Sequence, residues 1–231
     1  MSDRINKDTL GIQAENALKE EIISGQLEGL QRIGASHYAE KWSISTTPIR
    51  DAFKKLETEG WLQISPRRGV FVNEIDWKEL KEIYEVRMAI ETTAIRLATP
   101  NVPQNQSTRA LEEYLKAQRT DSGEREKLLR DADFRVHELA MEYCGNVRLQ
   151  KLAESIHHLV RWSQQTLIGN LPTPYEDTLE EHIEICRAVC RGDAEQAAIS
   201  MRLHLEKSLQ RIHNFLGPEV APRADHKGIT L

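Results

Sequence analysis

One short stretch carries the β-strand signal of this sequence, "WLQISPRRGVFVNEI" at residues 61–75. Apolar and polar residues alternate on both sides of a Pro-Arg-Arg-Gly turn, which predicts a β-hairpin. Before and after this stretch, apolar residues recur every three or four positions, as on one face of an α-helix. Because an isolated hairpin is only marginally stable and must pack on other elements, we expect a mainly α-helical fold.

Three short helical patterns precede the hairpin. They are expected over residues 8–24 and 35–42 and between Ser45 and Gly60, where Ser45 is the N-cap and Gly60 the stop signal. Three helices followed by a β-hairpin wing is the element order of a winged helix-turn-helix domain. We assign this domain to residues 1–74.

The chain beyond residue 75 is expected to be all helical. Its turns contain Pro, Gly or Asp, and Asp193 is a good N-cap for the last helix. We predict an all-α bundle of about six helices over residues 75–216, whereas residues 217–231 lack periodicity and should form a flexible tail. The helical patterns cover roughly residues 76–99, 105–118, 123–143, 147–168, 176–191 and 194–215.

The composition argues against a membrane protein but not against a DNA-binding one. No apolar run approaches the ~18 residues of a membrane-spanning helix, and the polar N-terminus lacks a signal-peptide pattern, so we expect a cytoplasmic protein. The 231 residues carry a net charge of −5, yet residues 41–68 hold six basic against three acidic side chains. Charges farther away than about 8–10 Å are screened at physiological salt, so this local basic region could approach DNA.

The third helical pattern and the hairpin turn contain the residue types that read DNA. Hydroxyls and helix-start N–H groups come from Ser45 and the two threonines after it, and Arg50 follows one turn later. An arginine that donates two hydrogen bonds to guanine contributes roughly 1–3 kcal/mol of base discrimination. The alternative is a solvated helix face, in which Arg50 and the next lysines lie beside acidic neighbours. The candidate DNA contacts are Ser45, Thr46, Thr47, Arg50, Lys54 with its neighbour Lys55, Arg67, Arg68 and Gly69.

The helical region contains a set of residues that could hold a metal ion. Asp133 and His137 are four positions apart and share a helix face, and His182 and His204 lie on two later helices. Facing helices can bring such side chains to one ion, and one carboxylate with three imidazoles suits Zn²⁺, Ni²⁺ or another first-row metal. The chain has eight histidines, so spacing alone leaves open that each is an ordinary core or surface histidine.

Arg87 interrupts the apolar stripe of the first helix after the hairpin. An unpaired buried charge is costly, so Arg87 needs a partner. That partner is either Glu91, four positions later, or the carboxylate of a bound effector. Arg161 is a second candidate for effector contact.

Four segments of the first domain carry a family resemblance. They are "IISGQL" (22–27), "STTPIRDA" (45–52), "LETEG" (56–60) and "RRGVFV" (67–72). They resemble the GntR superfamily of bacterial transcription regulators, which commonly has Arg where this chain has Thr46 and a basic residue where it has Ser36. Arg50 matches a DNA-contact arginine of that family. The resemblance therefore implies that Arg50 contacts DNA and that the operator differs from the family's common one.

Two later segments, "DFRVHELAMEYCGN" (133–146) and "EEHIEICRAVCRGDAEQAAISMRLHLEKS" (180–208), resemble the helical ligand-sensing FCD domain of the FadR-type GntR subfamily. All four metal-ligand positions of that pattern are filled here, by Asp133, His137, His182 and His204. The resemblance thus implies the metal-containing branch. It also places an arginine at Arg87, in an R-x-x-x-E pattern.

Together these features predict a DNA-binding transcription regulator and not an enzyme. We expect a homodimer on a near-palindromic double-stranded operator. By the resemblance it is a repressor controlled by a small organic acid bound at the metal. Two alternatives stay open: a metal-responsive regulator in which the ion is the signal, and a metal-dependent enzyme with a DNA-binding head, although no general base is recognisable near these motifs.

Overall fold

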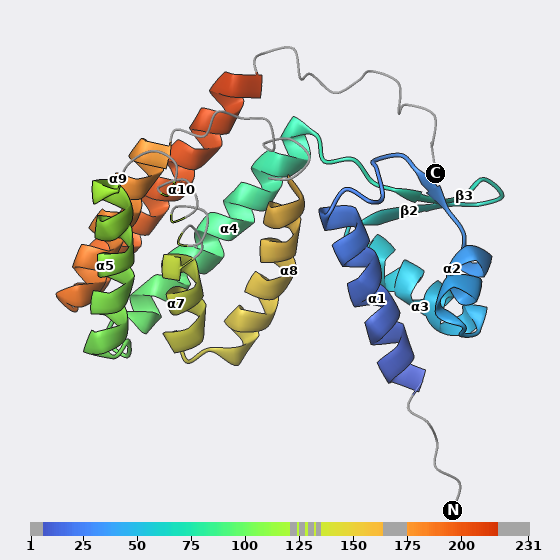
Figure 1. The fold of residues 1–231 in the computed structure, drawn as a ribbon, viewed down its shortest axis with the longest axis horizontal. Coiled ribbons are helices and arrows are strands. Elements are labelled where there is room, and N and C mark those ends of the chain that lie inside the picture. The colour runs from blue at the N-terminus through green and yellow to red at the C-terminus, as the bar shows by residue number, and fades with distance from the viewer. Residues whose placement is uncertain are drawn as a thin grey trace, which may run out of the picture. The chain divides into compact units, whose positions relative to one another are not determined.

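The computed structural model describes residues 7–120, 124, 128, 132, 135–163 and 175–216 of the chain (Figure 1). Contacts group these residues into two compact units. The first contains the described residues up to Asp76 together with a helix end that begins at His158, and the second contains the others. Asp133 and the predicted flexible tail lie outside the described residues.

The first unit has the winged helix-turn-helix order that the sequence predicts. Its helix bounds differ from the predicted ones by at most two residues. Strand β1 was not predicted, because two residues are too few to show an alternating pattern. It pairs antiparallel with β3 in a sheet of order β1-β3-β2. The elements are α1 (Lys7–Ile23), β1 (Arg32–Ile33), α2 (Ala35–Trp42), α3 (Thr46–Thr58), β2 (Leu62–Ser65) and β3 (Gly69–Val72).

Helices α1 and α3 pack against each other through apolar residues spaced three or four positions apart. Leu18 and Ile22 of α1 and Ile49 and Leu56 of α3 are fully buried. Burying one such side chain contributes roughly 1.5–3 kcal/mol. This packing fixes the position of α3 within the domain.

Gly60 ends α3 with a φ of +83°, a conformation that a residue with a Cβ rarely adopts. The turn lets the backbone N–H of Trp61 donate to the carbonyl of Leu56 over 2.8 Å. The fully buried Trp61 ring then stacks on Trp162, at 5.1 Å between centroids and 14° between planes. The end of the helix that carries Trp162 is therefore part of the first unit's core.

The second unit consists of helices in the part of the chain that the structure describes (Figure 1). Helix α10 packs against α4 and α9, while α7 packs against α4 and α5 against α9. Asp193 caps α10 as predicted, because its Oδ1 accepts the backbone N–H of Gln196 over 3.0 Å. The bounds are α4 (Trp77–Ala98), α5 (Gln104–Arg119), α7 (Arg135–Tyr143), α8 (Val147–Ser163), α9 (Tyr175–Cys190) and α10 (Ala194–Leu216).

The core of the second unit is rich in alanine. Small side chains let helix backbones approach closely, so longer side chains on neighbouring helices can meet between them. Among the described residues, no helix has the length and apolar character needed to cross a bilayer. The fully buried alanines are Ala94, Ala98, Ala110, Ala117, Ala140, Ala188, Ala197 and Ala198.

Candidate functional site

The start of α3 presents the side chains that the sequence assigned to DNA contact. Ser45 occupies the N-cap position, but its hydroxyl makes no capping hydrogen bond. Ser45, Thr47, Arg50 and Lys54 are exposed, and Thr46 is half-buried. Arg50 and Lys54 make no ion pair with any residue that the structure describes, so both cations face solvent unneutralised.

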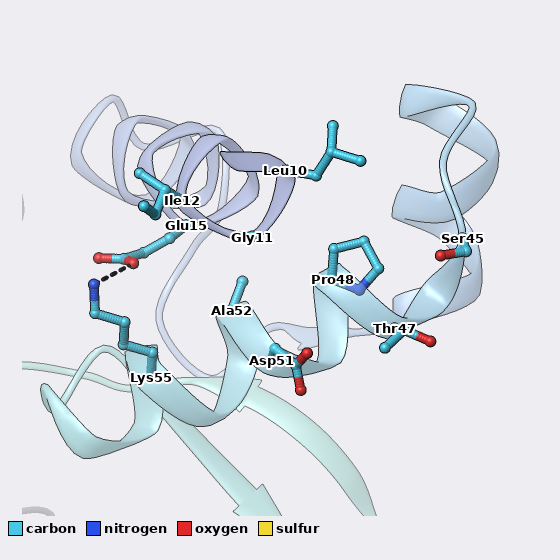
Figure 2. Close-up of a pocket in the computed structure, with 10 residues that line it drawn as sticks. All are labelled: Leu10, Gly11, Ile12, Glu15, Ser45, Thr47, Pro48, Asp51, Ala52 and Lys55. Atoms are coloured by element: carbon cyan, nitrogen blue, oxygen red, sulfur yellow. Dashed lines mark hydrogen bonds and ion pairs between the residues drawn. The ribbon is translucent and has the colours of Figure 1, made fainter. Parts of the chain in front are cut away.

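A hollow of about 580 Å³ lies beside the contact between α1 and α3 and is lined by residues of both helices (Figure 2). Thr47, Asp51 and Lys55, spaced four residues apart, all line it. Lys55 Nζ lies 2.6 Å from Glu15 Oε2 of α1, as the dashed line in Figure 2 shows. Lys55 is thus tied to α1, and this distinguishes it from Lys54.

Glu15 belongs to a buried chain of charges that joins α1 to the end of α3. Lys19 Nζ lies 2.7 Å from Glu15 Oε1 and 2.6 Å from Glu59 Oε2. Only 4% of Glu15 and 6% of Lys19 are exposed. Breaking such a buried pair leaves an uncompensated charge, so this network helps to hold α3 in place.

The wing adds three exposed arginines, Arg67 and Arg68 at the predicted turn and Arg32 on β1, of which Arg32 was not predicted. Ser36, the candidate on α2, is also exposed. A Cβ at Gly69 would lie only 2.8 Å from Nε of Arg32 on β1. The absent side chain at Gly69 therefore makes room for the Arg32 guanidinium, which has no ion-pair partner among the described residues.

Three of the predicted metal ligands converge in the second unit. His137 of α7, His182 of α9 and His204 of α10 are 2%, 2% and 4% exposed. Their rings lie 4.4–5.4 Å apart between centroids. One nitrogen from each ring lies within 4.8 Å of the others. Helix packing thus brings together residues that are 67 positions apart at the extremes, counted from 137 to 204.

Two of these rings donate hydrogen bonds to glutamates. His137 Nδ1 bonds to Glu91 Oε2 of α4, and His204 Nδ1 bonds to Glu181 Oε2 of α9 over 2.9 Å. Burial raises the pKa of both carboxyls, but stronger opposing effects win. Arg87 and His137 hold the pKa of Glu91 well below its usual range, and hydrogen bonds from His204 and Arg211 lower the pKa of Glu181 to about 2.

Burial is the main cause that lowers the pKa of all three imidazoles. For His204 the pKa falls to about 4, although the bond to Glu181 opposes the shift. The rings are therefore neutral at neutral pH, which is the form that binds a metal. Because an ionised carboxylate can only accept, Nδ1 of His137 and His204 must carry the hydrogen, and Nε2 carries the lone pair.

The triad fits a transition metal. Nε2 of His182 is buried and has no hydrogen-bond partner among the residues that the structure describes, and an unsatisfied buried polar atom costs about 1–3 kcal/mol. A metal ion would satisfy that atom. Three imidazoles suit Zn²⁺, Ni²⁺ and similar ions and leave coordination positions for other ligands.

Comparison with known families also gives two parts, an N-terminal helix-turn-helix domain and a C-terminal helical domain. Residues 10–72 match the family "Bacterial regulatory proteins, gntR family", and residues 82–207, more than half of the chain, match the FCD domain. The chain belongs to the GntR family and carries an FCD domain. It is therefore a transcriptional regulator with a DNA-binding domain, and FCD domains can bind metal.

This GntR regulator is similar to other bacterial regulators over most of its length. It is 27% identical over 210 residues to the HTH-type transcriptional regulator YdhC of Bacillus subtilis, covering 89% of this chain and 92% of YdhC. It is 26% identical over 177 residues to the HTH-type transcriptional repressor RspR of Escherichia coli, covering 76% of each. The structure of E. coli McbR/YncC shares the fold, with a TM-score of 0.66, 22% identity and coverage of 90% of this chain and 99% of that one.

The two predicted effector contacts of the regulator lie in different units. Arg87 is buried, and its Nε donates to Glu91 Oε1 over 2.6 Å, so the ion pair weighed in the sequence analysis is present. Arg161 belongs to the first unit, where it lies 3.6 Å from Glu20 of α1 and is about half exposed. Glu91 and Glu181 were missed as parts of the site, although each stands next to a motif, in R-x-x-x-E and E-H.

Proposed function

We propose that this GntR regulator binds its operator as a homodimer and that a small organic acid, bound at a metal ion in the FCD domain, controls operator affinity. One observation carries the proposal: three buried histidines from three helices present neutral imidazoles to one point. The same chain contains a helix-turn-helix domain whose exposed Arg50 and Lys54 have no ion-pair partner among the described residues. The first feature suits a sensor and the second suits a DNA reader.

The ion, Zn²⁺ or Ni²⁺, would be held by His137, His182 and His204, with Asp133 proposed as a fourth ligand from the sequence pattern. A bound divalent ion supplies open positions that the carboxylate of an effector can occupy. Arg87 is proposed to bind the same carboxylate, because a guanidinium can donate two parallel hydrogen bonds to a carboxylate. Arg161 is proposed as a further effector contact.

On the DNA side, Arg50 and Lys54 of α3 and the arginines of the wing are proposed to contact the operator. Ser36, Ser45, Thr46, Thr47 and Gly69 complete the proposed surface. A repressor is the direction of control that we favour, because RspR, a similar protein, is named a repressor. We propose no catalytic role, since both domains belong to regulator families.

Exposed apolar side chains support the homodimer. Val86 and Leu97 on α4 and Ile199 and Leu203 on α10 are 39–51% exposed. A two-fold dimer would cover such residues and present two recognition helices to two half-sites. Sedimentation equilibrium tests this point, because a monomer at micromolar concentration would contradict it.

A thermal-shift screen of small organic acids against the metal-loaded protein tests the whole proposal. A ligand that binds only the folded state adds about 2.7 kcal/mol of stability at 100 times its Kd, so a true effector raises Tm. The same acid should change operator affinity about 5–150-fold, the usual range of allosteric coupling. If chelation alone changes operator affinity and no acid does, the metal-responsive alternative is favoured.

A further inference from the structure

Two hydrogen-bonded relays lead to the histidine triad, and they have the same order of residues. In the first relay, Arg87 Nε donates to Glu91 Oε1 over 2.6 Å, and Glu91 Oε2 accepts from Nδ1 of His137. His157 Nε2 donates to the same Glu91 Oε1 over 3.2 Å. Each side chain from Arg87 to His137 is at most 3% exposed. This relay is therefore wholly inside the protein.

The second relay repeats the Arg–Glu–His order on other helices. Arg211 Nη1 and Nη2 donate to the two oxygens of Glu181 over 2.7 and 2.9 Å, and Glu181 Oε2 accepts from Nδ1 of His204 over 2.9 Å. These three residues line a groove of about 720 Å³ between α9 and α10. Arg211 is 21% exposed, so this relay reaches the surface.

We infer that Glu91 and Glu181 are positioning residues of the metal centre. Each holds one imidazole in the Nδ1–H tautomer and fixes the orientation of its ring, so that Nε2 is the nitrogen offered to the ion. The arginine behind each glutamate keeps the carboxylate ionised and in place. The inference rests on the proposed metal-binding function, because ring orientation matters to an ion only if one binds.

His182, the third histidine of the triad, differs from the two that hydrogen-bond to glutamates. Within the described residues this ring makes no hydrogen bond to a glutamate, and it packs against Tyr114, at 5.1 Å between centroids. Its Nε2 is buried and has no hydrogen-bond partner among the same residues. His137 and His204 are thus held by glutamates, whereas His182 is held by packing. In such a site the ring of His182 can adjust to the bound ion.

Metal affinity of the full chain tests the inference, with Zn²⁺ alone as the probe and a chelator as competitor. Glu181→Ala should weaken zinc binding about 10–100-fold, as losses of such carboxylate partners do elsewhere. Glu181→Gln should weaken it less, because the amide oxygen still accepts from Nδ1 but carries no charge. Glu184→Gln is the matched control, since Glu184 is on the same helix, about half exposed and paired with the surface residue Arg187, and it should leave affinity unchanged.

The tautomer of each histidine gives a readout that a merely structural role would not move. Nitrogen-15 spectra of the metal-free protein should show His204 and His137 with hydrogen on Nδ1. Glu181→Ala should remove that preference at His204 and leave it at His137, while Glu91→Ala should remove it at His137 and leave it at His204. Near-UV circular dichroism reports whether Glu91→Ala stays folded, because the change removes the carboxylate that pairs with Arg87.

The outcomes separate this inference from the proposed function. If the wild type binds zinc and Glu181→Ala binds it equally tightly, the positioning role is wrong. If the wild type binds no zinc, nickel or cobalt, the proposed metal function is wrong, and the tautomers still decide whether the glutamates orient the rings. A mixture of tautomers at His204 in the wild type would overturn the positioning role directly.

Discussion

The two candidate sites of this regulator are built in opposite ways. The proposed DNA-contact cations Arg50, Lys54, Arg67 and Arg68 come from one continuous stretch and are exposed, without ion-pair partners among the described residues. The metal candidates come from three helices that are far apart in sequence, and they are at most 4% exposed. An exposed site needs only a local scaffold, whereas a buried one needs the whole helical unit to be packed.

Because one site is exposed and the other is buried, charge has a different role in each. Exposed cations attract phosphates in a way that salt screens. The buried imidazoles are neutral, and two of them, His137 and His204, hydrogen-bond to ionised glutamates that are themselves paired with arginines. The two sites should therefore be separable by mutation, with little effect of one on the other in the absence of effector.

The largest effect is expected from removing two ligands of the buried site. His182→Ala combined with His204→Ala should reduce bound metal from about one ion per chain to almost none, because His137 and the proposed ligand Asp133 alone are too few to retain it. Elemental analysis of the purified protein measures this. Operator affinity without effector should change little, and His213→Ala, on the same helix but exposed, should retain the ion. Unchanged stoichiometry in the double variant would rule out the site.

The next largest effect belongs to the exposed site. Arg50→Ala should weaken operator binding by about 1–3 kcal/mol, because it removes the best-placed guanidinium for base contact. Fluorescence anisotropy with labelled operator measures the loss, and metal content should stay at the wild-type level. Full operator affinity in this variant would show that α3 is not the recognition helix.

The neighbouring lysines Lys54 and Lys55 allow a comparison between a cation without an ion pair among the described residues and one that is paired with Glu15. Lys54→Ala should weaken DNA binding and reduce the slope of log affinity against log salt by about 1, as loss of a phosphate contact does. Lys55→Ala should have a smaller effect, because Glu15 already pairs with Lys55. Affinities measured at several salt concentrations compare the two. Equal effects would mean that the Glu15 pair does not restrain Lys55.

The smallest effect is expected at the edge of the wing. Arg32→Ala should weaken binding to all DNA sequences to a similar extent, at most as strongly as Lys54→Ala, since a backbone contact carries no base specificity. Specific and non-specific duplexes measured side by side test this. Gln63→Ala, an exposed and uncharged change in the same sheet, is the control. A loss confined to the specific operator would instead place Arg32 at a base.

Much of the fold was predictable because its signals are local. Ser45, Gly60 and Asp193 mark helix ends through the chemistry of single residues, and the Pro-Arg-Arg-Gly turn marks the hairpin. Strand β1 was not predicted, because its two residues form a strand only by pairing with β3. For Arg87 the pattern offered two partners, and only the packed structure shows Glu91 at 2.6 Å.

By itself, the sequence determined the order of the helices and of the hairpin strands, the family and the candidate metal-binding histidines, since each depends on residue type and short spacing. The tertiary structure decided that three of those histidines meet at one place, that Lys55 is paired while Lys54 has no ion-pair partner among the described residues, and that Gly69 makes room for Arg32. It also decided that Glu91 and Glu181 stand behind the triad. Those outcomes depend on distances between helices, and such distances are set by how side chains pack, which no short stretch of sequence encodes.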